Sequence, residues 1–154
     1  MKFKIMVYII TAILLSGCFQ KKPEIPVDKP QETILDLSII ATGTQKPLAV
    51  YFLSLKKVDR FKKLDYYEIA KKYLQKSKNG IIKRTKITLS PQKMFKKRLK
   101  LGKDVQYYAV AVGFSNVDIN DNWRYIQEII PESVNDITLL INENNITKIE
   151  KEKE

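Results

Sequence analysis

The sequence predicts an all-β fold, an antiparallel β-sandwich with a small helical insertion after the second strand. Seven or eight short segments either alternate apolar and polar residues or are apolar throughout, and polar turn residues separate them. One stretch, residues 60–78, instead spaces its apolar residues with the period of a helix. No internal repeat is visible, and the part with strand character is long enough to bury a single core.

The first two strands are expected at residues 33–41 and 48–55. In the first segment, alternate leucines and isoleucines share one face, as in a half-buried strand. The second segment is apolar on both faces, which indicates a strand that is covered on both sides. Residues 42–47, which include one glycine and one proline, are expected to form the connecting loop.

The helical stretch follows the second strand. Asp59 is its expected N-cap, and Asn79 and Gly80 are expected to end it. Lys63 interrupts the apolar arc, so the pattern fits two short helices as well as it fits one.

Residues 84–101 are expected to form a hairpin that turns at residues 90–93. Alternate residues on its inner face are apolar, with Lys97 as the one misfit. These strands could contact membrane phosphates through a basic outer face, or the cations could keep the strands from pairing with another chain, and we favour the second interpretation. The basic residues of this face are Arg84, Lys86, Lys96, Arg98 and Lys100.

The C-terminal half completes the predicted sandwich. Residues 105–114 are apolar on both faces and are expected to form a central strand, and residues 123–129 alternate again. Residues 137–141 indicate a further core face, and a tight turn then leads to a last short strand near residues 146–149.

The amino terminus predicts a secretion signal. Two lysines precede an apolar run at residues 5–15, which is too short for a membrane-spanning helix of about 20 residues. The run ends in Leu15-Ser16-Gly17-Cys18, the lipobox pattern at which a bacterial lipoprotein is cleaved before the cysteine that receives lipid. The alternative is a non-lipidated signal peptide that happens to contain a cysteine.

The predicted organisation has four parts. Phe19, rather than aspartate, follows Cys18, which favours lipid anchoring at the periplasmic face of the outer membrane. Three of the six prolines follow closely, so an extended tether is expected there. The parts are a signal peptide at residues 1–17, a lipidated tether at 18–32, the sandwich domain at 33–149 and a polar tail at 150–154.

Composition narrows the functional classes. Cys18 is the only cysteine, and the chain has no histidine. An intramolecular disulfide, Ser-His-Asp or Cys-His catalysis and histidine metal sites are thereby excluded, and we expect no enzyme, cofactor or metal site. The formal net charge is +11. In an exported protein, anionic head groups, a cell-wall polymer such as peptidoglycan or an acidic protein patch are better candidate ligands than nucleic acid, but we favour a solvated lysine-rich surface without a specific ligand.

Three local patterns have both a structural and a functional interpretation. Trp123 and Arg124 could form an exposed recognition pair, but a buried indole beside an arginine that makes a surface ion pair is favoured. The polar loop at residues 115–122 contains acidic residues but lacks the spacing of a calcium loop, and it fits a plain turn. Asn145 lies in an acceptor pattern for bacterial N-glycosylation, which a hairpin turn also explains.

Several segments together resemble a known family. The lipobox comes first, and residues 49–69, 87–101, 107–126 and 136–146 then match family segments in the same order. This order is similar to that of the outer-membrane lipoproteins of type VI secretion systems, called TssJ, SciN or VasD. The matching positions include Val50, Leu53, Leu55, Phe61, Asp65, Tyr66, Tyr67, Ile69, Phe114, Asp118, Trp123 and Arg124.

The sequence also departs from the family pattern. Gln92 stands where the family has a turn glycine, and Ser115 and Asn116 replace the usual arginine and aspartate. The loop at residues 42–47 is shorter than usual.

The resemblance implies a transthyretin-like β-sandwich with an added helical piece, and a scaffolding role. Proteins of the family bind the periplasmic carboxy-terminal domain of the inner-membrane protein TssM, and the loop between the first two strands is a main contact. By position, the resemblance implies that the partner-binding residues are Thr42, Gly43, Thr44, Gln45, Lys46 and Pro47.

Overall fold

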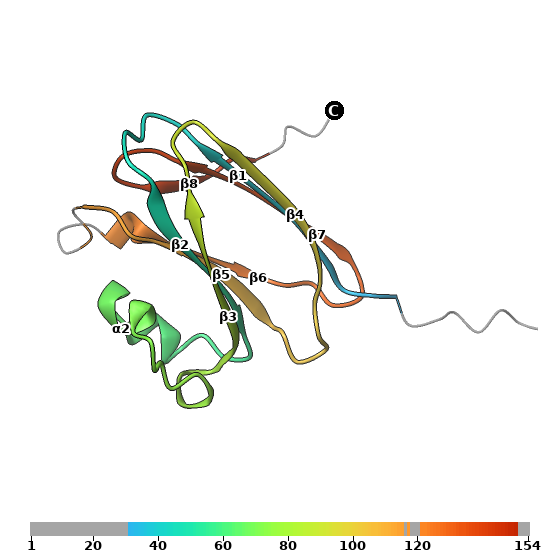
Figure 1. Ribbon diagram of the computed structural model, residues 1–154. Helices are drawn as coiled ribbons and strands as arrows, with labels where there is room; N and C mark the ends of the chain where they lie inside the picture. The colour runs from blue at the N-terminus through green and yellow to red at the C-terminus, as the bar shows by residue number, and fades with distance from the viewer. Residues whose placement is uncertain (1–30, 116, 118–120, 151–154) are drawn as a thin grey trace, which may run out of the picture.

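The computed structural model describes residues 31–115, residue 117 and residues 121–150. Two four-stranded sheets face each other in this part of the chain (Figure 1), one with strand order β4-β1-β7-β8 and one with order β3-β2-β5-β6. The strands are β1 (Ile34–Ala41), β2 (Leu48–Leu55), β3 (Ile81–Leu89), β4 (Met94–Lys100), β5 (Tyr107–Val112), β6 (Arg124–Glu128), β7 (Val134–Ile141) and β8 (Ile146–Lys148).

The predicted β-sandwich is confirmed, with one pair of strands that runs parallel. β1 is antiparallel to β4 on one side and parallel to β7 on the other, so that Leu37 lies between Lys97 and Ile137. β5 pairs with β2 and with β6, which confirms its predicted central position. The core fills the space between the sheets, where Phe52 of β2 stacks on Phe95 of β4 with ring centroids 5.3 Å apart.

The predicted hairpin at residues 84–101 is wrong, because its two strands belong to different sheets. β3 pairs with β2, and β4 pairs with β1. A β3–β4 ladder would have set like charges opposite one another, which destabilises a sheet. In the observed register, Arg98 instead lies opposite Asp36 and donates two hydrogen bonds to its carboxylate, at 2.7 and 2.6 Å.

The helical insertion consists of three short pieces. They are the 3-10 turn Phe61–Lys63, helix α2 (Tyr66–Ala70) and the 3-10 turn Ser77–Asn79. Gly80 ends the insertion with a φ of 73°, as predicted.

The expected N-cap at Asp59 is wrong, because Asp65 caps α2 instead. The Asp65 carboxylate accepts from the Glu68 N–H at 2.7 Å, and the Glu68 carboxylate accepts from the Asp65 N–H at 3.1 Å. This capping box satisfies two backbone donors at the helix start, which the Asp59 position cannot do for a helix that begins at Tyr66.

The insertion covers the outer face of the β2-β5 sheet (Figure 1). Arg84 on β3 donates hydrogen bonds to the carbonyl oxygens of Ile69 and Lys71, the latter at 2.7 Å. Arg124 on β6 donates to the carbonyl oxygen of Leu64 at 3.0 Å. Arg84 thus binds carbonyl oxygens at the C-terminal end of α2, where helical carbonyls lack partners within the helix, and Arg124 binds a carbonyl oxygen just before α2 begins.

Residues 1–30 and 151–154 lie outside the described residues, and with them the predicted signal peptide, Cys18 and most of the predicted tether and tail. Among the described residues, no helix is long and apolar enough to cross a membrane.

Candidate partner-binding end of the sandwich

The loop at residues 42–47 lies at the end of the sandwich where β1 stops and β2 begins (Figure 1). The Thr42 N–H donates to the Ile141 carbonyl at 2.8 Å, and the Ala41 N–H donates to the Lys93 carbonyl at 3.1 Å. These bonds fix the start of the loop to β7 and to the β3–β4 connection. Gly43 then turns the chain with a φ of 69°, a conformation that favours glycine.

Three connections meet at this end and enclose a hollow of about 330 Å³. Its lining comes from the β1–β2 loop, from Ser115 after β5 and from the β7–β8 turn. Thr44 is only 6% exposed and holds the middle of the β1–β2 loop against the body of the protein. The residues that line the hollow are Thr44, Gln45, Lys46, Leu48, Ser115, Glu143 and Asn144.

The β7–β8 turn is organised by one side chain. The Asn142 amide oxygen accepts from the backbone N–H groups of Asn144 at 3.0 Å and Asn145 at 2.9 Å. Because asparagine readily closes such turns on its own backbone, the turn needs no glycine. The Asn145 side chain accepts weakly from the Thr147 hydroxyl at 3.5 Å, and its glycosylation remains a prediction.

The structure places five of the six loop residues that the family resemblance implies at the rim of this end. Gln45, Lys46 and Pro47 are exposed there along with Thr42 and Gly43, whereas Thr44 is buried. Sequence reasoning missed Glu143 and Asn144, since nothing in the sequence indicates that a turn about a hundred residues away adjoins the first loop. The only indication in the sequence was the polar character of the turn that follows the core segment at residues 137–141 and contains Glu143 and Asn144.

The chemistry of the hollow suits contact with another protein. Its lining offers hydroxyl and amide groups with one lysine and one glutamate, so it can both donate and accept hydrogen bonds. The described residues contain no cluster of three or more histidine, cysteine, aspartate or glutamate residues that could hold a metal ion. Part of the polar loop at 115–122 lies outside the described residues.

The prediction of a buried Trp123 is confirmed, whereas the predicted surface ion pair of Arg124 is wrong, because its guanidinium binds a backbone carbonyl instead. Trp123 is 4% exposed, and its ring packs edge-on against Tyr66 with centroids 5.9 Å apart. The Arg124 guanidinium lies 4.9 Å from the Trp123 ring centroid and also binds the insertion. The pair therefore joins the insertion to the sheet.

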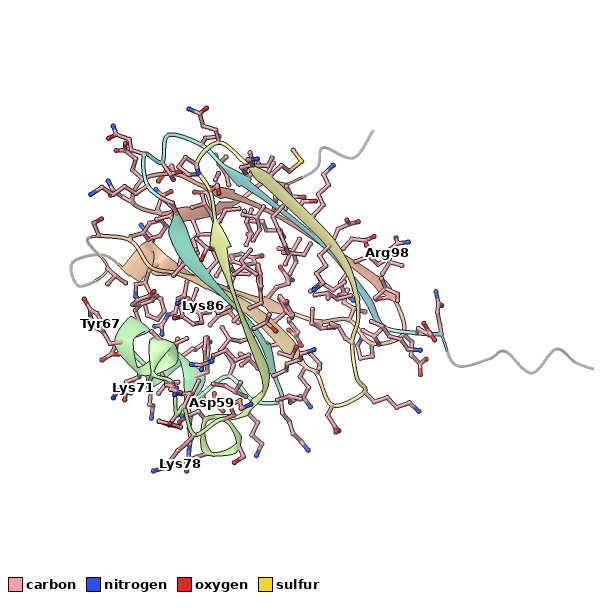
Figure 2. All side chains as sticks on the ribbon, viewed as in Figure 1. Asp59, Tyr67, Lys71, Lys78, Lys86 and Arg98 are labelled. Carbon is pink, nitrogen blue, oxygen red and sulfur yellow. The ribbon has the colours of Figure 1, made fainter. Side chains whose placement is uncertain are left out.

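The basic face predicted for a single hairpin is divided between the two sheets. Arg84 and Lys86 lie on the β2-β5 sheet, where both cations are within 5.7 Å of the Tyr51 ring centroid. Arg98 lies on the other sheet, and Figure 2 shows it far from Lys86. The five predicted cations thus form no common surface.

Comparison with known proteins identifies the family. Residues 36–144 match the family model described as "Type VI secretion lipoprotein, VasD, EvfM, TssJ". This match covers nearly the whole sandwich, from β1 to the β7–β8 turn. Curated protein sequences gave no match.

Solved structures show the same fold. The type VI secretion lipoprotein TssJ1 from Pseudomonas aeruginosa matches with a TM-score of 0.69 and 13% identity, covering 80% of this chain and 99% of that one. Lip from Serratia marcescens, a membrane-bound component of the type VI secretion system, matches with a TM-score of 0.68 and 16% identity, covering 79% and 99%.

A third match is a chain in the structure of the TssM C-terminal domain (869–1107) from EAEC. It has a TM-score of 0.62 and 18% identity, and covers 77% of this chain and 99% of that chain. The family resemblance and the predicted β-sandwich fold are thus both confirmed: the chain belongs to the type VI secretion lipoprotein family.

Proposed function

We propose that this protein anchors a type VI secretion membrane complex to the outer membrane by lipid on Cys18, and binds the periplasmic C-terminal domain of TssM. The family match over residues 36–144 carries the proposal. The partner-binding surface in this proposal is the loop at residues 42–47 together with the adjoining β7–β8 turn.

The geometry of the sandwich supports this division of roles. β1 begins at Ile34, next to the tether, and ends at Ala41, next to the loop at 42–47. Eight extended residues span roughly 25 Å, so the lipid-bearing segment and the proposed contact surface join opposite ends of the domain. An anchor at one end leaves the other end accessible to a partner rooted in the inner membrane.

The third structural match adds support for TssM as the partner. Because 77% of this 154-residue chain covers 99% of the matched chain, the matched chain is about the size of the sandwich domain. The span 869–1107 is longer than the whole of this chain. A chain of this size is thus shorter than the TssM span. Its presence in a structure named for the TssM domain is expected if a lipoprotein of this fold forms a complex with TssM.

Calorimetric titration of residues 18–154, carrying Cys18→Ser, against the TssM periplasmic domain tests the interaction. We expect Lys46→Glu to weaken binding at least about tenfold, because it adds a second acidic group beside Glu143. Lys103→Glu, an equal charge reversal at the exposed turn after β4, is the matched control and should leave the affinity unchanged. Equal effects of both variants would reject the loop as the contact, and no binding at micromolar concentrations would reject the function.

Secretion by cells tests the anchor separately. Cys18→Ser should leave the domain folded and able to bind TssM in solution, yet abolish secretion, because the lipid is the proposed link to the outer membrane. Secretion at native expression of the variant would contradict the bridging role.

A further inference from the structure

The two sheets leave an open seam along one side, between the edge strands β3 and β4. β3 pairs only with β2 and β4 only with β1, so the outer edges of both strands are free of strand partners among the described residues. Two lysines occupy positions on the inner faces of these strands. Lys83 lies opposite buried Ser54, and Lys97 lies opposite buried Leu37.

The seam contains a cavity of about 90 Å³. Roughly 10–15 Å³ suffices for one water, so the space holds several waters or one phosphate group. Its walls are apolar on one part and polar on the other in about equal measure, and three lysines are among its lining residues. The lining consists of Leu37, Phe52, Ser54, Lys83, Thr85, Phe95, Lys97, Leu99, Lys100, Leu101 and Tyr108.

A polar row crosses the inner face of the sheet at this cavity. Tyr108 of β5, Ser54 of β2 and Lys83 of β3 lie directly opposite one another in the ladder. Tyr108 is 4% exposed and Ser54 is 9% exposed. Within the described part of the chain, neither hydroxyl has a hydrogen-bond partner, and a buried polar group without one is unfavourable.

The charges at the cavity indicate the kind of occupant. Lys83 and Lys97 form no ion pair with any described residue, and both line the same cavity as the two hydroxyls. Burial raises the pKa of the Tyr108 hydroxyl, so it remains a hydrogen-bond donor. Two ammonium groups and two hydroxyl donors beside apolar walls match an anionic oxygen group attached to carbon chains.

The cavity lies at the tether end of the sandwich. Lys100, which lines it, binds the carboxylate of Glu32, and the Leu101 N–H donates to the Thr33 carbonyl at 2.9 Å. The chain that leads toward Cys18 therefore leaves the domain beside the cavity. More cations gather at the same end around a second hollow lined by Lys56, Lys57, Asp59, Arg60, Ser77, Lys78 and Gly80.

We propose that the β3–β4 seam binds the phosphate of an anionic phospholipid head group and seats this end of the domain on the membrane. The choice of a membrane lipid rests on the proposed anchoring at Cys18. Lys83 and Lys97 hold the phosphate, Ser54 and Tyr108 donate to its oxygens, and the apolar walls contact the adjoining lipid carbons. The loop at residues 42–47 then faces away from the membrane.

Vesicle flotation tests the proposal with residues 18–154 carrying Cys18→Ser, so that no acyl chain contributes. The protein should bind vesicles in which about a third of the lipid is phosphatidylglycerol and the rest phosphatidylcholine, and should ignore vesicles of pure phosphatidylcholine. Binding should disappear at about 1 M salt, where charges are screened within roughly 3 Å. Equal binding to both vesicles would overturn the proposal.

A matched pair of variants separates the seam from general positive charge. Each lysine near an anionic surface contributes about fivefold, so Lys83→Gln with Lys97→Gln should weaken binding roughly 25-fold. Lys71→Gln with Lys72→Gln removes the same charge from the helical insertion, where Figure 2 shows Lys71, and should change binding less than about twofold. Equal losses of vesicle binding in the two double variants would overturn the seam as the site. Unchanged vesicle binding together with new self-association of the Lys83→Gln, Lys97→Gln variant would also overturn it, and would mean that these lysines keep the edge strands from pairing with another chain.

Tyr108→Phe provides a readout that a purely structural role would not move. Removing an unpartnered hydroxyl should leave the melting temperature unchanged or higher, but should weaken binding to the anionic vesicles several-fold. Unchanged binding would mean that water alone fills the cavity. Saturation by inorganic phosphate without vesicle binding, or sedimentation with peptidoglycan sacculi but not with vesicles, would overturn the lipid assignment. None of these outcomes affects the TssM titration, so the two proposals fail separately.

Discussion

Gly113 leaves the space that the phenol group of Tyr66 occupies. A Cβ atom on residue 113 would overlap the Tyr66 hydroxyl and lie 2.7 Å from its Cζ. The same Tyr66 ring packs edge-on against Tyr51, 6.1 Å away, and against Trp123, 5.9 Å away. Gly113 therefore determines how closely the helical insertion can approach the β2-β5 sheet.

We expect Gly113→Ala to lower the free energy of unfolding by about 1–3 kcal/mol, as overpacking does in other cores. Tyr66 must move to admit the methyl group, and the aromatic cluster moves with it. Urea unfolding measures the change. Gly102→Ala is the control, since a Cβ there meets nothing within 4 Å, and a comparable loss in that variant would contradict the steric explanation.

Alkaline pH should destabilise the protein through its tyrosines. Burial, followed by the neighbouring Tyr51, raises the pKa of Tyr66 to about 12, and burial also raises the pKa of Tyr108 and Tyr125. An unfolded tyrosine loses its proton near pH 10. The unfolded chain therefore binds fewer protons than the native protein above that pH, and native stability falls as the pH rises from about 10 to 12.

Urea midpoints between pH 8 and pH 11.5 measure this loss. The midpoint should fall steeply only above about pH 10. Tyr66→Phe removes one of the shifted groups, so the variant should lose less stability than the parent over the same interval. An identical fall in the two proteins would assign the effect to other groups.

The start of helix α2 gives a second matched pair. Asp65→Ala removes one half of the capping box and should destabilise the protein by about 1 kcal/mol. Asp59→Ala, at the position that the sequence favoured as the cap, should have almost no effect. Thermal unfolding of the two variants checks the assignment, and a larger effect at Asp59 would reverse it.

Gln92 has a φ of 56°, in the region that favours glycine. The family resemblance implies a turn glycine at this position, and the positive φ is the conformation that a glycine would adopt there without strain. Gln92→Gly should stabilise the protein by about 0.5–1 kcal/mol, because it relieves the contact between Cβ and the carbonyl oxygen. Lys93→Gly, at a neighbour without a positive φ, should destabilise it, and stabilisation by both would rule out this cause.

The sequence predicted individual strands better than their partners. The alternation of Leu35, Leu37 and Ile39, and the run at 48–55 with apolar residues on both faces, matched β1 and β2 closely, because burial of a face acts on residues that are near in sequence. The link at 90–93 resembled a hairpin turn, since a pattern of alternation is the same whether the next strand joins the same sheet or crosses to the other one.

The candidate site was predictable only in part, because a sequence pattern reports on residues that are near one another in the chain. The polar loop at 42–47 was recognisable from its composition and from the family resemblance. The position of Glu143 and Asn144 beside this loop, and the position of Lys83 and Lys97 at one cavity, depend on the packing of segments that are distant in sequence. The sequence did show Lys97 as a misfit on an apolar face. It did not show that Lys83 lines the same cavity.

The position of β1 between β4 and β7 also determines when the protein can fold. Both partners are distant in sequence, with Ile34 opposite Lys100 on one side and Val134 on the other. Contacts between residues so far apart in sequence make folding slow, because the entropy of closing a long loop is lost before the strand pairing stabilises the chain. A chain emerging amino terminus first cannot complete this sheet until β7 is released. The β4-β1-β7-β8 sheet therefore stays incomplete until the carboxy-terminal part of the chain is available to pair with β1.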